Sequence, residues 1–98
     1  MAKKGYLVSA YRSIKDPDKL AAYAKLAGPA FAKHGAKYLV RDVAAQAYEA
    51  GVKAGILIVE FESVEKAVAA HDSPDYQAAL KVFDNCAERD LRIVEGLE

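Results

Sequence analysis

An apolar run near the middle of the chain dominates its pattern of hydrophobic and polar positions. Positions 56–59 read Ile-Leu-Ile-Val, and only Glu60 separates them from Phe61. β-Branched and aromatic residues in so short and regular a run are typical of a strand. Because both alternating sets of side chains are apolar, the pattern predicts a strand that is buried on both faces.

After this run the apolar positions recur at helical spacing. Ser63 offers a hydroxyl that can cap a helix, and the stripe that follows consists of Val64, Ala67, Val68 and His71. Ser73-Pro74-Asp75 is a second helix start, because proline is tolerated at the first helical position and an acid suits the positive end of the helix dipole. The stripe of this second helix is Tyr76, Ala79, Leu80, Phe83 and Ala87.

The N-terminal third shows the same change from strand to helix. Its aromatic and β-branched residues predict a strand over Tyr6–Arg12, and Asp16-Pro17-Asp18 begins a helix with a cap, a proline and an acid. Gly28-Pro29 lies inside this helix and predicts a bend, because proline removes one backbone hydrogen bond. His34-Gly35 predicts the end of the helix. Its apolar stripe is Leu20, Tyr23, Ala24, Ala27 and Phe31.

Shorter strands are predicted around the central one. Tyr38–Arg41 is the second strand and Ala45–Tyr48 a weaker third, followed by a flexible connection between Gly51 and Gly55. The last strand contains Leu91, Ile93 and Val94 and is closed by Gly96.

The order of elements predicts the fold class. Strand, helix, strand, strand, helix pair and strand form the βαββαβ pattern of a ferredoxin-like α+β fold, with an antiparallel sheet and helices on one face. A single domain is expected over residues 1–98.

The apolar central strand conflicts with a sheet covered on one face only. The second face of such a sheet should be polar, whereas both sets of side chains on the central strand are apolar. Leaving four of these side chains in water would forfeit roughly 1.5–3 kcal/mol each. A second copy of the same face is the simplest cover, so a homodimer with two-fold symmetry is expected.

Composition and charge narrow the function classes. Lys plus Arg and Asp plus Glu both number 14, so no excess of basic residues is available for a phosphate backbone, and nucleic acid is not an expected partner. The single cysteine rules out an intramolecular disulfide, and the start MAKKGYLV lacks the apolar core of a signal peptide. We therefore expect a cytoplasmic protein without a membrane span, since no apolar run approaches about twenty residues.

Several short segments resemble a known family. They include His34-Gly35-Ala36-Lys37-Tyr38-Leu39-Val40-Arg41, Ser73-Pro74-Asp75-Tyr76-Gln77 and Ile93-Val94-Glu95-Gly96. Together with Lys4-Gly5-Tyr6, Asp16-Pro17 and the stretch from Glu60 to Glu65, they resemble the family catalogued as domain of unknown function 1330 (DUF1330). The resemblance implies a dimeric α/β barrel, in which two ferredoxin-like subunits join their sheets. That superfamily includes cofactor-independent monooxygenases, isomerases, haem enzymes and proteins without known activity, so the fold does not choose among them.

The chain departs from the family pattern at three places. Relatives often carry an arginine where this chain has Gly55, an aromatic pair where it has Ala70-His71, and an arginine where it has Phe83. The resemblance therefore brings no anion-binding arginine to these positions.

Two histidines are candidates for chemistry. His71 continues an apolar stripe and is expected to point toward the sheet, where an imidazole can act as a general acid or base. The alternative is a histidine that caps the last carbonyls of its helix, and His34 has the same two interpretations. Asp72 either orients the His71 ring or belongs to the turn between helices.

Tyrosines and arginines are candidates for ligand binding. Tyr6, Tyr38 and Tyr76 are among the phenols that can line a pocket for a planar or carbonyl-bearing molecule, and the alternative is that each ring is half core and half surface. Arg41 can hold a carboxylate or be a solvated residue at a strand end. No metal is expected, because the histidines are far apart without a cysteine cluster, and no phosphate loop or dinucleotide fingerprint indicates a cofactor.

Three functions remain open at this stage. The first is a homodimer that binds a small organic molecule between sheet and helices. The second is a cofactor-independent enzyme of monooxygenase or isomerase type, in which His71 acts with Tyr76 or Arg41. The third is a module whose second sheet face serves only dimerisation.

Overall fold

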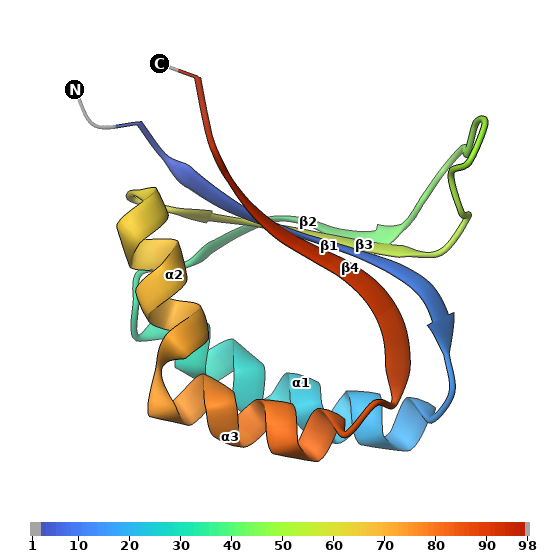
Figure 1. Cartoon of the computed structure of the whole chain (residues 1–98), viewed down its shortest axis with the longest axis horizontal. Coiled ribbons are helices and arrows are strands. Elements are labelled where there is room, and N and C mark those ends of the chain that lie inside the picture. Colours follow the sequence, from blue (N-terminus) through green and yellow to red (C-terminus); the bar gives the residue numbers. More distant parts are fainter. Residues whose placement is uncertain (1–2, 98) are drawn as a thin grey trace.

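The computed structural model describes residues 3–97 and contains one antiparallel sheet with helices on one of its faces (Figure 1). Along the chain the elements are β1 (Gly5–Ile14), α1 (Pro17–Ala32), β2 (Lys37–Val43), β3 (Gly55–Phe61), α2 (Val64–Asp72), α3 (Pro74–Phe83) and β4 (Ala87–Glu95). The strands lie in the order β2-β3-β1-β4. This is the ferredoxin-like arrangement that the sequence predicts.

Each helix begins at the cap that the sequence indicates. The carboxylate of Asp16 accepts hydrogen bonds from the backbone N–H groups of Asp18 and Lys19 at 3.1 and 3.2 Å. Ser63 caps α2, and Ser73 caps α3. These side chains bond backbone donors that have no partner inside the helix, so the local sequence fixes where the helices start.

The first helix runs without interruption through Pro29 and ends at Ala32. Gly35 has a φ of 76°, which glycine adopts without strain, and the chain leaves the helix there as predicted. A bend at Gly28-Pro29 stays a prediction.

Two predicted element bounds are wrong. Ala45–Tyr48 is no strand but part of the loop between β2 and β3, which extends away from the helices (Figure 1). Both edges of β3 are already occupied, by β2 and β1, so this segment finds no free edge there. Ala87 belongs to β4 and not to the preceding helix, because Asp84 and Asn85 take left-handed conformations that turn the chain.

The core lies between the inner face of the sheet and the helices. Leu7, Val59 and Phe61 from the sheet are fully buried. They meet Tyr23, Ala27, Phe31, Ala67, Ala70, Tyr76 and Ala79 from the helices. Val68 is 41% exposed, so the buried side of α2 runs through its alanines and not through the predicted valine.

The opposite face of the sheet, here called the outer face, is not covered by the described residues. Alternation along β3 sends Leu57 and Val59 toward the helices and Ile56 and Ile58 to the outer face, where both are only half-buried. Val94 of β4 is 47% exposed. The prediction that β3 is buried on both faces is therefore wrong for the single chain, and the apolar outer face still lacks a cover.

Candidate functional site

A cavity of about 370 Å³ opens between α1 and the inner face of the sheet. Its size lies within the roughly 300–1,000 Å³ that is common for small-molecule sites. The walls are mostly apolar and include Leu20, Ala27 and Phe31 from α1 and Leu57 from β3. Such walls favour an organic ligand with a large apolar surface.

A bulge in β2 brings two predicted ligand-binding residues to this cavity. Tyr38 pairs with Val59 and Val40 pairs with Ile58, so Leu39 is an extra residue in the ladder. Without a bulge, residues three apart would lie on opposite faces of the strand. The extra residue lets Tyr38 and Arg41 both line the cavity.

These two residues interact with each other. The guanidinium carbon of Arg41 lies 5.7 Å from the centre of the Tyr38 ring, within the range of a cation–π contact. Burial raises the pKa of the Tyr38 phenol. The charge of Arg41 has a smaller, opposite effect that does not cancel this rise. The phenol is therefore neutral at physiological pH and can donate a hydrogen bond. The next residue, Asp42, pairs with Ile56 of the outer face, and its carboxylate accepts a bond from the backbone N–H of Val43 at 2.7 Å.

A cluster of phenols around Arg89 lies behind the wall of the cavity. Arg89 donates hydrogen bonds to the hydroxyls of Tyr11, Tyr23 and Tyr76. The hydroxyls of Tyr23 and Tyr76 are 2.7 Å apart and share a further bond. Burial, followed by the neighbouring Tyr76, raises the pKa of Tyr23 far above its usual range. Tyr11 and Tyr23 also line the cavity, so the cluster and the cavity are contiguous.

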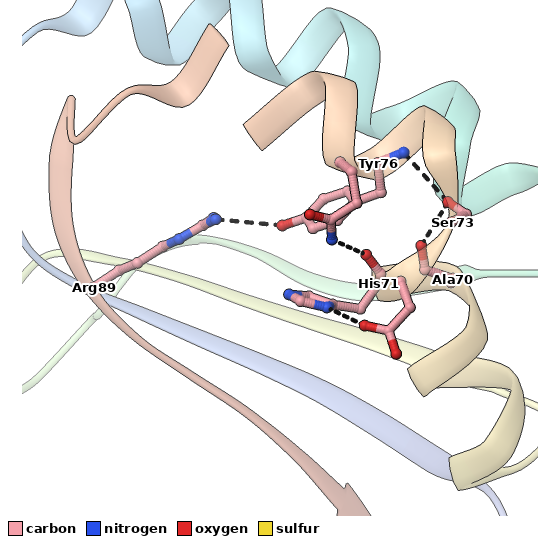
Figure 2. A network of polar contacts seen from close by, with 7 residues as sticks. Ala70, His71, Ser73, Tyr76 and Arg89 are labelled. Atoms are coloured by element: carbon pink, nitrogen blue, oxygen red, sulfur yellow. Dashed lines mark hydrogen bonds and ion pairs between the residues drawn. The ribbon is translucent and has the colours of Figure 1, made fainter. Parts of the chain in front are cut away.

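His71 lies at a different place from the cavity. Its side chain is 32% exposed, its ring centre is 5.2 Å from that of Tyr76, and its Nδ1 is 3.0 Å from the Asp72 carboxylate. Figure 2 shows this arrangement, with Arg89 approaching Tyr76 from β4. His71 does not line either of the two cavities described here. The polar partner predicted for His71 is therefore present, as Asp72. The His71 ring is connected to the cavity only indirectly, because it lies near Tyr76, whose hydroxyl is bonded to that of Tyr23.

The other predicted binding residues are dispersed. Tyr6 belongs to the outer face and donates a hydrogen bond to the Glu60 carboxylate at 3.2 Å. Tyr76 is fully buried and reaches the cavity only through its bond to Tyr23. His34 is half-buried just beyond the end of α1, away from the cavity walls.

A second cavity, of about 450 Å³, lies on the outer face beneath the loop between β2 and β3. Its lining includes Ala10 and Ile56 from the sheet and Tyr48, a loop residue that is 76% exposed. This space adjoins the uncovered apolar surface of the sheet.

Arg89 is the residue that the sequence interpretation missed. The predicted last strand began at Leu91, so the position of Arg89 was not considered. The alternation of side chains along a strand could have indicated its position. Residues 89, 91 and 93 share one face of a strand, and two of these three residues are apolar. An arginine on the apolar side of a strand indicates a buried cation with specific partners.

Within residues 3–97 no cluster of three or more His, Cys, Asp or Glu residues has the geometry to hold a metal ion. None of the helices in that range is long and apolar enough to span a membrane.

Solved structures show the same fold. A protein of unknown function from Rhodopseudomonas palustris, RPA0582, superposes with a TM-score of 0.77 at 18% identity, over 100% of this chain and 85% of its own. SnoaB, a cofactor-independent oxygenase from Streptomyces nogalater, has a TM-score of 0.68 at 9% identity, over 99% and 96% of the two chains. A dimeric ferredoxin-like protein of unknown function from Thermobifida fusca has a TM-score of 0.59 at 15% identity, over 97% and 92%.

The family comparison agrees with the resemblance seen in the sequence. No curated protein matches the chain. The family described as domain of unknown function (DUF1330) matches residues 4–97, which is nearly the whole chain. This protein therefore belongs to the DUF1330 family.

Proposed function

We propose that this protein binds a small organic molecule in the cavity between α1 and the sheet. The observation that carries the proposal is the combination of an apolar space of about 370 Å³ with a few polar groups at its edge, Tyr11, Tyr38 and Arg41. Apolar walls supply affinity through burial, and a small number of polar groups supply orientation.

The experiment compares the protein with a variant whose cavity is filled. Ala24 lines the cavity from an exposed position of α1. Ala24→Leu should fold normally and occupy the space that a ligand needs. Ala22→Leu, at an exposed position of the same helix, is the matched control. Melting temperatures are measured against a panel of small aromatic compounds, because binding to the native state raises stability with ligand concentration.

Two outcomes are distinguishable. The proposal expects compounds that raise the melting temperature of the wild type and of Ala22→Leu but leave that of Ala24→Leu unchanged. Equal shifts in both variants would place binding elsewhere, and no shift with any compound would leave only the dimerisation role.

We also propose that the protein is a homodimer through its outer face. Ile56, Ile58 and Val94 leave apolar surface there that a second copy can cover. The Thermobifida fusca protein of similar fold is described as dimeric. Ile58→Asp should reduce the sedimenting mass to that of one chain, whereas Val68→Asp, on the exposed side of α2, should not. A wild type that sediments as one chain at micromolar concentration would refute the dimer.

A catalytic role is the alternative, and the likeness of fold to the oxygenase SnoaB favours it. His71 would act as the base, linked to the cavity through Tyr76 and Tyr23. His71→Gln should then abolish turnover of a bound compound without changing its affinity. Undiminished turnover in that variant would exclude His71 as the base.

A cytoplasmic location stays part of the proposal and is consistent with the free, buried thiol of Cys86.

A further inference from the structure

Arg89 is a half-buried cation whose partners are all uncharged. Among residues 3–97 its hydrogen bonds run to phenol oxygens: Nη1 to Tyr11 at 3.4 Å and to Tyr23 at 3.1 Å, and Nη2 to Tyr76 at 3.3 Å. Its guanidinium carbon lies 4.2 Å from the centre of the Phe83 ring. Removing a guanidinium from water without a carboxylate partner is unfavourable, and these contacts offset only part of that loss.

The cluster around Arg89 has more hydrogen-bond donors than acceptors. A guanidinium carries five N–H groups and each phenol one O–H, whereas the phenol oxygens are the only acceptors that bond Arg89 within residues 3–97. One phenol proton is used between Tyr23 and Tyr76. The remaining phenol protons have no acceptor among residues 3–97.

Two phenols of this cluster reach the cavity wall. Tyr11 and Tyr23 belong both to the Arg89 cluster and to the cavity wall. An acceptor atom from a ligand would complete the hydrogen bonding of the cluster, and a negatively charged oxygen would do so best, because Arg89 places a positive charge directly behind the phenols.

Arg41 is a second cation at the cavity, but its position differs from that of Arg89. Arg41 is exposed and lies over the Tyr38 ring, whereas Arg89 is half-buried against the phenols. Solvent screens an exposed charge more strongly than a half-buried one. The charge of Arg89 therefore acts more strongly on a ligand oxygen bonded to Tyr11.

We propose that the cavity takes an apolar molecule with one anionic oxygen, and that this oxygen accepts its hydrogen bond from the Tyr11 hydroxyl. Arg89 is a positioning residue, which holds the phenol oxygen and supplies the charge behind it. Carboxylates, phenolates and enolates share this chemistry. The inference rests on the proposed binding function and specifies the ligand class.

The experiment uses three probes with the same fused rings: 2-naphthoate, 2-naphthamide and naphthalene. Their dissociation constants are measured by titration calorimetry. In the wild type the carboxylate should bind about tenfold or more tightly than the neutral amide, as expected for one charge-assisted hydrogen bond. Tyr11→Phe should bring that ratio close to one while leaving the affinity for naphthalene unchanged.

Further variants test the role of Arg89. Arg89→Gln should lose the preference for the carboxylate, and Arg89→Lys, which keeps the charge, should retain part of it. Arg92→Gln, at an exposed position of the same strand outside the cavity wall, is the matched control and should leave the ratio unchanged. If Arg89→Gln does not fold, Tyr11→Phe decides, because it removes a single oxygen atom.

Each result has one meaning. An undiminished ratio in Tyr11→Phe, or a ratio that disappears in Arg92→Gln, would overturn the inference. Equal binding of all three probes to the wild type would also overturn it, while the binding function itself would stand. If no probe binds, the binding function fails together with the inference.

Discussion

Replacing Phe31 by alanine tests the packing between α1 and the sheet. The ring is 1% exposed, stacks on Tyr76 with a centroid distance of 4.6 Å and meets the edge of Phe61 at 5.8 Å. Truncating a buried phenylalanine costs about 3–5 kcal/mol. Because one side of this ring already borders the cavity, solvent or neighbouring atoms can enter the vacated space, and we expect a loss near 3 kcal/mol.

Urea denaturation followed by circular dichroism measures this loss. A domain of this size has a free energy of unfolding of roughly 5–15 kcal/mol, so the variant should stay folded with a lower midpoint and an unchanged slope. Phe31→Leu, which keeps most of the volume, is the control and should lose less than about 1.5 kcal/mol. Both are measured at one protein concentration, since the proposed dimerisation would make stability concentration-dependent. A loss below about 1 kcal/mol for alanine would refute the burial of the ring.

Three further predictions concern single positions. Gly28→Ala should not bring the roughly 0.8–1.0 kcal/mol that this exchange gives in an ordinary helix, because the ring of the following Pro29 crowds an added Cβ; a full gain in thermal denaturation would contradict this. The Ser9 hydroxyl is buried and has no hydrogen-bond partner among residues 3–97, so Ser9→Ala should be neutral or stabilising by up to about 1–3 kcal/mol in urea denaturation, whereas a clear loss would reveal a partner. The hydrogen bond from Lys19 and its charge lower the pKa of Asp84 below the unfolded value of about 3.9, so this pair stabilises the fold above that pH and the contribution disappears as the pH falls through the lower folded pKa. Asp84→Asn should therefore be less stable than the wild type at pH 7 and equally stable in strong acid, and a difference that persists there would be inconsistent with the ion pair.

Features that depend on neighbouring residues in the sequence could be predicted. The helix starts at Asp16 and Ser73 follow from caps and prolines that act within one turn, and the structure has both. The alternation of β3 predicted an apolar outer face for the same reason, since side chains alternate in any strand.

The candidate site depends on contacts that short segments do not encode. Tyr38 and Arg41 reach the cavity together because of the bulge at Leu39, which arises from pairing with β3. Tyr11 and Arg89 lie opposite each other on paired strands although they are far apart in sequence. The loop at Ala45–Tyr48 was mistaken for a strand because its composition gave no information on whether a free sheet edge was available.

The position of a bound ligand tests the central claim most directly. Methyl groups of Leu20 and Leu57 line the cavity, whereas Val8 and Val94 belong to β1 and β4 on the outer face. Titration of 2-naphthoate into protein with labelled leucine and valine methyl groups should shift the Leu20 and Leu57 resonances and leave those of Val8 and Val94 in place. Shifts confined to the outer-face valines, or no shifts at saturating probe, would contradict a ligand site between α1 and the sheet.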